Sequence, residues 1–434
     1  MDLRETIVAT RAAARRLAAL SGEERGRLLS ELAAALERPA IRQAVLAANA
    51  EDMGRATADV AAGRLAAPLV KRLGLDDRKL DSAIDGLRQL AAKPELVGRV
   101  TTHRELDQGL ILKQVTCPLG VLGVVFEARP EAFIQITGLG WKSGNGLVVK
   151  GGREAKASNR ALCEVAREIL VAHGIDPRAL VLLEDRAEVD TLLGMHDLVE
   201  MMIARGSSEF IRHVRSNSRI PVMAHADGIC HLYLHEGADP GKAAHIAVDS
   251  KCSYPAACNS VETLLWEEGA SRALDACVAA LIAQQVELRG CAETIKRYPS
   301  MVPAADADWD TEYCAPILSI RRVAGLDQAL AHIERHGSRH TDAIVTEDAA
   351  AAARFLATVD AACVFHNAST RFSDGYRFGL GAEVGISTDK LHARGPVGVE
   401  GLLTYRWLLT GDGQATADYG PGGRRFTHRD LPDS

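Results

Sequence analysis

Beyond Leu110 the sequence alternates short apolar segments with helical ones, and this alternation limits the possible folds more than any other feature. The apolar segments are rich in β-branched residues and bounded by Gly or Pro, which is typical of strands. Extended strands and turns are expected at 111–130. Further strands are expected at 147–150, 179–183, 199–204 and 221–224, with helices at 155–172, 188–193 and 207–214 between them. A β-α-β rhythm of this kind indicates a parallel sheet covered by helices.

A second group of alternating segments follows and predicts a second α/β domain. Its strands are expected at 229–234, 262–266, 316–320 and 343–345, and its helices at 241–248, 271–285, 326–336 and 349–358. Roughly the first hundred residues show apolar positions at helical spacing instead, with Ser21 and Glu24 placed as a capping box. The sequence therefore predicts an N-terminal helical segment followed by two α/β domains.

Charge and cysteine usage exclude several classes of protein. The chain carries 51 Lys and Arg against 57 Asp and Glu, a net charge of −6, whereas nucleic-acid binders usually present a strongly basic face. Its nine cysteines include no C-x-x-C pair, which is unlike a disulfide framework or a zinc module and is typical of a reducing compartment. The N-terminus lacks an apolar signal core, and no uncharged run approaches the ~20 residues that span a bilayer. We expect a cytoplasmic protein that binds neither nucleic acid nor membrane.

Cys258 is the candidate nucleophile that the residues themselves favour. It lies among small residues in the segment YPAACNS, and Pro255 favours a loop, so the sulfur is expected to be accessible. A reactive thiolate needs such a position with polar N–H donors nearby. The local sequence leaves two alternatives open, because Cys258 could be one structural cysteine among nine, and Cys252 could be the nucleophile instead.

Two segments are candidates for binding a phosphate-bearing ligand, although neither a G-x-G-x-x-G nor a G-x-x-x-x-G-K-[ST] motif follows a strand. Arg205-Gly206-Ser207-Ser208 lies between a predicted strand and a predicted helix, where free N–H groups favour an anion. Lys150 ends the strand at 147–150, at the edge of a parallel sheet where ligands bind. The plainer alternatives are a serine that only caps its helix and a solvated lysine.

A metal site is not expected from the histidine-rich stretch 225–235. Cys230 and His231 are neighbours in a predicted strand and face opposite sides, so they cannot converge on one ion with His225 and His235. The glycine-rich segments 378–386 and 392–398 instead indicate a shaped substrate loop, with a purely structural connection as the alternative.

Several longer segments are shared with one known family. They include SGNGLVVKGGREA, RGSSEFI and HADGICHLYL and, most specifically, YPAACNSVETLL and FGLGAEVGISTDKLHARGPVGVEGLLTYRWLL. Through them the chain, from about residue 5 to about residue 412, resembles the gamma-glutamyl phosphate reductase family of the aldehyde dehydrogenase superfamily. YPAACN and DGYRFGLGAE are especially similar to the reductase half of bifunctional pyrroline-carboxylate synthase. Because this chain lacks the kinase half, it resembles the stand-alone reductase.

The resemblance implies an aldehyde-dehydrogenase-like α/β fold with two parallel-sheet domains and a small β arm for oligomerisation. The NADP-binding domain would span 1–228, interrupted near 101–119 by an arm strand, with the catalytic domain at 229–402 and a C-terminal arm at 403–434. The implied catalytic residues are Cys258 and Asn259, and the implied cofactor-binding residues are Lys150, Gly206, Ser207 and Glu312. The implied substrate-binding residues are Asn367, Ser369, Thr370, Arg371, Gly379 and Gly381.

The resemblance also implies a reaction, the reduction of L-glutamyl 5-phosphate by NADPH to L-glutamate 5-semialdehyde and phosphate through a cysteine thioacyl intermediate. This is the second step of proline biosynthesis from glutamate, and a homo-oligomer (dimer or tetramer) and a glutamate kinase partner are implied with it. The alternative is a hydrolytic NAD(P)-dependent aldehyde dehydrogenase. Hydrolytic relatives carry an oxyanion Asn and a water-activating Glu, which by simple counting fall here at Ala128 and near His225. Both replacements favour the reductase, with backbone N–H groups at Cys258 or Asn259 as oxyanion donors.

Overall fold

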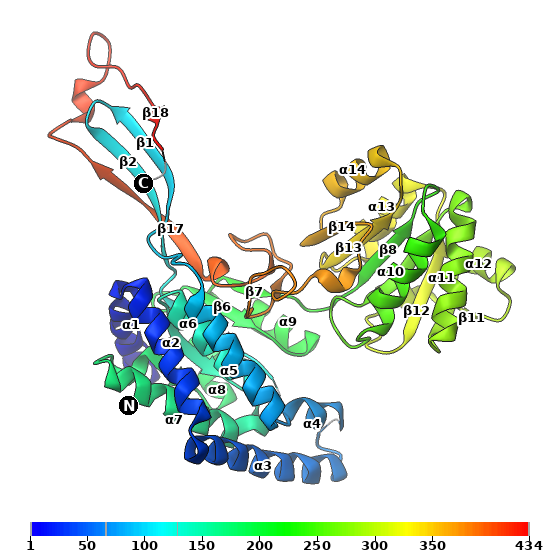
Figure 1. Cartoon of the computed structure of the whole chain (residues 1–434), viewed down its shortest axis with the longest axis horizontal. Coiled ribbons are helices and arrows are strands. Elements are labelled where there is room, and N and C mark those ends of the chain that lie inside the picture. The colour runs from blue at the N-terminus through cyan, green and yellow to red at the C-terminus, as the bar shows by residue number, and fades with distance from the viewer. Residues whose placement is uncertain (1, 66, 128, 433–434) are drawn as a thin grey trace.

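Three sheets organise the chain, and Figure 1 shows them in three separate parts of the molecule. The computed structural model describes residues 2–65, 67–127 and 129–432, so the position of Ala128 lies outside the described residues. A five-stranded and a seven-stranded parallel sheet form the two main bodies, and a four-stranded antiparallel sheet forms an arm that extends away from both.

The first body is built on the five-stranded sheet, whose strand order is β5-β4-β3-β6-β7. Its strands are β3 (Val121–Val125), β4 (Gly146–Lys150), β5 (Leu180–Leu182), β6 (Met201–Ala204) and β7 (Val222–Ala224). The helices that follow its strands are α6 (Pro130–Lys142), α7 (Lys156–Ala172), α8 (Arg186–Leu192) and α9 (Ser208–Asn217). The four strands and three helices expected between residues 147 and 224 are confirmed, with bounds that differ by a few residues. The strand order reverses between β3 and β6, and such a switch point opens a crevice at the carboxyl ends of the strands.

The N-terminal helices cover this body. They are α1 (Leu3–Ala19), α2 (Gly22–Glu37), α3 (Pro39–Ala61), α4 (Ala67–Leu73) and α5 (Asp77–Ala92). In Figure 1 α2 and α5 lie beside α6, and the apolar faces of α1, α2 and α5 share one core with Trp141 and with the strands β3 and β4. The predicted capping box is confirmed, because Ser21 Oγ accepts the Glu24 N–H at 3.2 Å and Glu24 Oε2 accepts the Ser21 N–H at 2.7 Å.

The second body is built on the seven-stranded sheet, whose order is β11-β10-β12-β9-β8-β13-β14. Its strands are β8 (Cys230–Leu234), β9 (Val261–Trp266), β10 (Glu287–Gly290), β11 (Val302–Pro303), β12 (Ile317–Arg322), β13 (Thr341–Val345) and β14 (Cys363–His366). Its helices are α10 (Pro240–Cys252), α11 (Ser271–Ala283), α12 (Ala292–Arg297), α13 (Leu326–His336) and α14 (Ala349–Thr358). The expected strands β8, β9, β12 and β13 are confirmed, whereas β10, β11, β14 and α12 were not predicted.

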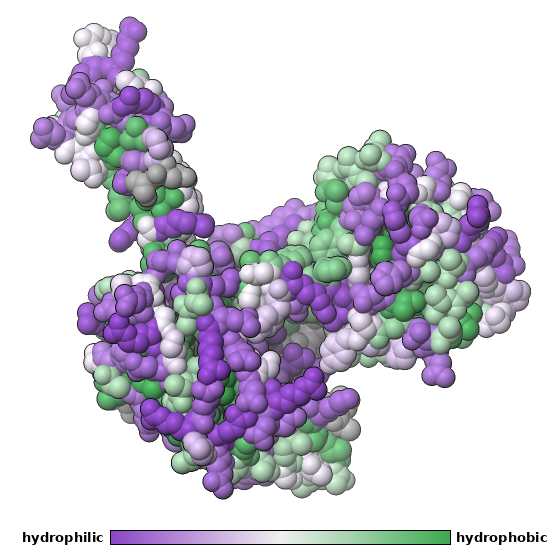
Figure 2. Space-filling model, in the orientation of Figure 1, coloured by the Kyte–Doolittle hydropathy of each residue, from purple (hydrophilic) through white to green (hydrophobic). Residues whose placement is uncertain are grey.

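The arm pairs segments that are far apart in the sequence. Its strand order is β17-β2-β1-β18, with β17 (Leu403–Thr410), β2 (Leu110–Pro118), β1 (Val100–Asp107) and β18 (Arg429–Asp430). A further two-stranded ribbon joins β15 (Ile386–Ser387) to β16 (Gly395–Pro396). Apolar surface is visible on the arm in Figure 2, and Tyr405, Trp407 and Leu409 of the edge strand β17 are each more than half exposed, at 56%, 51% and 58%.

No helix in the described part of the chain combines the length and the apolar character needed to cross a membrane.

The direction of the strands explains where a site can form. Because all strands of the seven-stranded sheet are parallel, the segments that precede β8, β9, β12 and β13 open at the same amino edge. The segment 225–229 leads to this edge directly from the carboxyl end of β7 in the other sheet. The carboxyl edge of one sheet and the amino edge of the other therefore share one linker.

A buried ion pair fixes both ends of the loop 253–260 at this edge. Lys251 Nζ in the last turn of α10 and Glu262 Oε2 near the start of β9 are 2.6 Å apart, and neither side chain is exposed. Removing two charges from water is costly, so each group depends on the other to remain buried.

Lys251→Met is expected to lower the free energy of unfolding by about 3–5 kcal/mol, because it leaves the Glu262 carboxyl buried without its cation. The double variant Lys251→Met, Glu262→Leu removes both charges and should recover most of that loss. Urea denaturation followed by circular dichroism measures both values. An equal loss in the single and double variants would contradict this interpretation of the pair.

Candidate functional site

Cys258 lies in the loop between α10 and β9, where turns hold the chain in a fixed course. The Ala257 N–H donates to Tyr254 O at 3.1 Å, and the Ser260 N–H donates to Ala257 O at 2.8 Å. Within the described residues, the N–H groups of Cys258 and Asn259 donate to no protein acceptor. The thiol is partly exposed, and two free donors next to it can stabilise an oxyanion that forms on a carbonyl at the sulfur.

The linker 225–229 packs directly on this loop. A Cβ added to Gly228 would lie 2.0 Å from Cys258 O and 2.6 Å from Cys258 Cα, which leaves room for glycine only. The Cys230 thiol also donates to Cys258 O at 3.3 Å. The backbone of the candidate nucleophile is therefore held by the segment that joins the two bodies.

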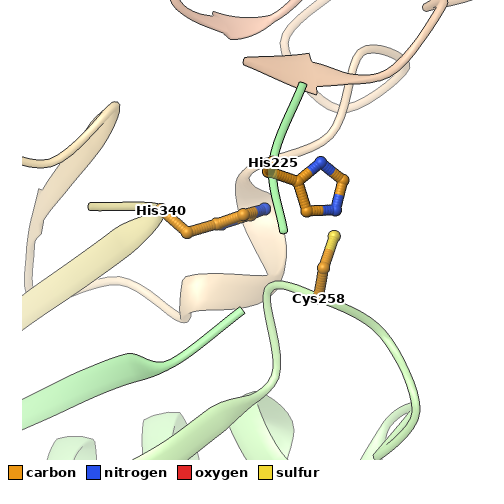
Figure 3. A group of neighbouring side chains, drawn as sticks. All are labelled: His225, Cys258 and His340. Atoms are coloured by element: carbon orange, nitrogen blue, oxygen red, sulfur yellow. The ribbon is translucent and has the colours of Figure 1, made fainter. Parts of the chain in front are cut away.

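Two histidines converge on the Cys258 sulfur from opposite bodies (Figure 3). His225 follows β7, and His340 precedes β13. One ring nitrogen of each histidine and the Cys258 sulfur all lie within 4.8 Å of one another. His225 Nδ1 donates to Ile386 O at 3.0 Å, since a carbonyl can only accept, and this leaves a lone pair on Nε2 of the neutral ring. Burial, together with the neighbouring Arg205, lowers the pKa of His225 and favours that neutral form.

Charged groups surround the three side chains. Arg205 follows β6, and Arg371 donates from Nε to Ser253 Oγ at 3.1 Å. Burial lowers the pKa of both guanidinium groups, and the charge of a Cys258 thiolate opposes this shift. Burial raises the pKa of Glu383, which accepts the Gly375 N–H at 2.9 Å. Two cations near the sulfur make the site suitable for an anionic substrate.

A cleft lies at the carboxyl end of the five-stranded sheet, as the strand order requires. Its volume is about 180 Å³, and Lys150, Arg153 and Arg186 are among its lining residues. Lys150 ends β4 as expected, and burial lowers the pKa of its ammonium group. The cations and the switch-point position suit a phosphate-bearing ligand.

The helix after β6 begins beside this cleft. Ser207 caps α9, because its Oγ accepts the Phe210 N–H at 3.4 Å. The Ser207 N–H donates to Glu127 Oε2 at 3.0 Å, and a Cβ on Gly206 would lie 2.7 Å from the Glu127 carboxyl carbon. The serine cap is thus present, and the anion position at this helix start holds a carboxylate.

Comparisons with known proteins identify the family. A curated gamma-glutamyl phosphate reductase of Synechococcus sp. (strain JA-3-3Ab) is 52% identical over 423 residues, which covers 97% of this chain and 92% of that protein. The crystal structure of gamma-glutamyl phosphate reductase from Thermotoga maritima is 34% identical, with a TM-score of 0.91 over 96% of this chain and 100% of the other. This chain belongs to the gamma-glutamyl phosphate reductase family.

The fold extends beyond the family. An acetylating aldehyde dehydrogenase from Geobacillus thermoglucosidasius shares it at 16% identity, with a TM-score of 0.65 over 95% of this chain and 97% of that one. The α/β fold of the aldehyde dehydrogenase type is confirmed. A scan against protein-family models found no match.

Three of the residues that the family resemblance implies for substrate binding make hydrogen bonds within the protein or are buried in it. Asn367 adopts a left-handed backbone, with φ of 53°, and its amide bonds the backbone of Thr346 at 3.0 and 2.9 Å. Thr370 is fully buried and donates to Asn259 O at 2.7 Å, and Ser369 is 4% exposed. Their contacts position the Cys258 loop and its surroundings.

The remaining implied residues differ in burial, since Gly379 is exposed whereas Gly381 and Asn259 are buried. Gly379 and Gly381 have φ of 74° and 75°, a region that favours glycine, and Lys93 Nζ donates to Gly379 O at 3.2 Å. Asn259 is 4% exposed and donates from Nδ2 to Ser373 O at 2.8 Å, so its side chain anchors the loop while its N–H stays free. Glu312 precedes β12 and lies near His225, and burial raises the pKa of its carboxyl group.

Sequence reasoning missed His340 and the packing role of Gly228. His340 adjoins a predicted strand, but only the strand order brings it to the edge that carries Cys258. Of the four residues weighed for a metal, Cys230 donates to Cys258 O, and His231 Nδ1 pairs with Asp342 at 2.9 Å.

Gly228→Ala is expected to slow the alkylation of Cys258 by iodoacetamide about 100-fold, because the added methyl group displaces the loop from His225 by an ångström or more. The matched control is Gly54→Ala, which adds a methyl group in α3 with nothing within 4 Å. Mass spectrometry of the modified peptide gives both rates. Unchanged alkylation of the Gly228 variant would mean that the loop accommodates the methyl group elsewhere.

Proposed function

We propose that this protein is a cytoplasmic reductase that converts L-glutamyl 5-phosphate and NADPH to L-glutamate 5-semialdehyde, phosphate and NADP, the second step of proline biosynthesis from glutamate. Family membership over nearly the whole chain is the observation that carries this proposal. The accessible Cys258 thiol, next to a histidine lone pair and two free N–H groups, supports it.

In the proposed reaction Cys258 is the nucleophile and Asn259 an oxyanion donor. His225 Nε2 accepts the thiol proton, and the sulfur forms a bond to the acyl carbon of the substrate. The bond between that carbon and the phosphate oxygen breaks, and phosphate leaves with the electron pair. The N–H groups of Cys258 and Asn259 stabilise the transient oxyanion. The cofactor, when bound, supplies the hydride that reduces the thioester carbon, after which the thiolate is released and takes a proton back.

Two cations near the sulfur are proposed to bind the anionic ends of the substrate. Arg205 comes from the first body, and Arg371 is held by Ser253 in the second. Both guanidinium groups interact with the charge of the Cys258 thiolate. One of them would neutralise the phosphate as it leaves, and a planar guanidinium suits such an oxyanion. Gly379 and Gly381, with Asn367, Ser369 and Thr370, would shape the rest of the substrate site.

The cofactor is proposed to lie in the cleft of the five-stranded sheet. Lys150 would contact the adenosine ribose and its 2′-phosphate, and the lining cations Arg153 and Arg186 suit that charge. Gly206 and Ser207 would lie beside the pyrophosphate, where the Glu127 carboxylate now accepts the Ser207 N–H. Glu312, near His225, would hold the nicotinamide ribose.

We also infer the division of the chain and its partners. The proposed NADP-binding domain is 1–228, interrupted near 101–119 by the arm, and the proposed catalytic domain is 229–402. The arm with 403–434 is proposed to join a second copy, because the edge strand β17 leaves apolar side chains exposed. A glutamate kinase that supplies the unstable acyl phosphate is a candidate partner.

A hydrolytic aldehyde dehydrogenase is the second candidate. The observation that favours it is His225, whose lone pair beside Cys258 could activate a water molecule on a thioester. Phosphate dependence of the reverse reaction separates the two functions.

Oxidation of glutamate semialdehyde by NADP should stop after about one turnover per Cys258 in phosphate-free buffer, since the thioester has no acceptor. Adding phosphate, or arsenate as its mimic, should restore steady turnover. NADPH absorbance measures both phases. Cys258→Ser should abolish the initial burst, and the matched Cys252→Ser should retain it. Sustained turnover without phosphate would make the hydrolytic function the better one.

Lys150→Ala should weaken NADPH binding about 10- to 100-fold, the loss expected for a charged hydrogen bond. NADH, which lacks the 2′-phosphate, should be affected much less. Fluorescence titration of the two reduced cofactors gives the comparison, with the exposed Lys242→Ala as control. Equal losses for both cofactors would remove the proposed 2′-phosphate contact.

A further inference from the structure

We propose that His225, Cys258 and His340 form a binding site for a soft divalent cation, with Zn²⁺ as the fitting ion, and that the bound ion holds the Cys258 thiolate out of reaction. The three donor atoms lie within 4.8 Å of one another, and Figure 3 shows the two rings and the sulfur pointing toward one another. The site is defined by the positions of three side chains, and its regulatory role rests on the proposed function of Cys258 as the nucleophile.

The donor set matches the preference of zinc. One thiolate and two imidazoles leave a fourth tetrahedral position open, as in sites that exchange their ligands. Donors around tetrahedral zinc lie roughly 3.3–3.6 Å apart, so the side chains must close by about 1 Å. The partly exposed Cys258 and His225 can do this by small rotations, because their burial is incomplete.

The surroundings of the two histidines already orient them for a metal. His225 Nδ1 donates to Ile386 O at 3.0 Å, and His340 Nδ1 lies 2.8 Å from Thr341 Oγ1. Such bonds at one ring nitrogen fix the ring and direct the other toward a metal ion.

His340 supplies an independent observation. Its side chain has no exposed surface, and within the described residues its Nε2 has no hydrogen-bond partner. A buried polar atom without a partner costs free energy, and a metal ion would satisfy it. The proposed reaction assigns this imidazole no task, so the ion accounts for a feature that the catalysis leaves unexplained.

The charge around the cluster is mixed. Arg205 and Arg371 oppose a cation, whereas the Cys258 thiolate and the carboxyl groups of Glu312 and Glu383 favour one. Binding releases the thiol proton to solvent as the sulfur–zinc bond forms. Because a bound zinc ion withdraws charge from the thiolate and occupies the space beside the sulfur, it opposes attack on the acyl phosphate.

Metal binding is tested on the full-length protein without its substrates. Zn²⁺ titrated against a chromophoric chelator should bind at one ion per chain, and Co²⁺ should give a thiolate-to-cobalt charge-transfer band. Cys258→Ser should remove the band, and His340→Asn should weaken binding at least about tenfold. Cys252→Ser and the exposed His245→Asn are matched controls and should bind as the parent protein does. A charge-transfer band that persists in Cys258→Ser would overturn the site.

A second measurement covers the case in which the buried His340 variant does not fold. Zn²⁺ should protect Cys258 of the parent protein from iodoacetamide, a chelator should reverse the protection, and His225→Asn should lose most of it. Alkylation equally fast with and without Zn²⁺ would reject the proposal. Neither readout uses the reductase reaction, so a failed phosphate-dependence test and a failed zinc test are distinguishable.

Discussion

The contact between Gly228 and the backbone of Cys258 is the constraint on which the site depends. The linker 225–229 is the direct path from β7 of one sheet to β8 of the other, and it crosses the loop that carries the nucleophile. A side chain at residue 228 would overlap that loop, so the linker can pass only as glycine. The same crossing brings His225 to the Cys258 sulfur, so one close backbone approach sets both the connection between the two sheets and the position of His225 beside the candidate nucleophile.

The two parallel sheets present different candidate functional residues at their edges. The carboxyl edge of the five-stranded sheet carries Lys150 and the start of α9, positions suited to a phosphate-bearing ligand. The amino edge of the seven-stranded sheet carries Cys258 and His340. Polar contacts of buried groups fix the second edge, with the Lys251–Glu262 pair below the loop and Thr370 bonded to Asn259 O beside it. Rigid support of this kind is what an attacking thiolate needs.

Apolar runs and turn residues in the sequence predicted many of the strands, but not the contacts that depend on strand pairing. Strands with several consecutive apolar residues, such as β8 with LYL and β9 with LLW, were predicted. In contrast, β10 reads ELRG and β11 has only two residues, so neither shows a strand pattern. Cys258 and Lys150 could be proposed from the sequence because small neighbours mark the first and a strand end marks the second. His340 could not be found, since its approach to Cys258, 82 residues earlier in the chain, results from strand pairing between β8, β9 and β13.

His225, the other histidine beside the sulfur, bears on why a thioester at Cys258 would react with hydride and not with water. In the proposed reaction His225 takes the thiol proton before the thioester forms, and a protonated imidazole cannot activate water. Its Nδ1 is already committed to Ile386 O, so the proton can leave only from Nε2, beside the sulfur and the departing phosphate. The order of proton transfers would therefore decide the fate of the thioester. The departing phosphate is a far stronger base than imidazole and must take up one proton as it leaves. A proton from solvent keeps His225 protonated until the hydride arrives, whereas a proton from His225 restores a base that water can use.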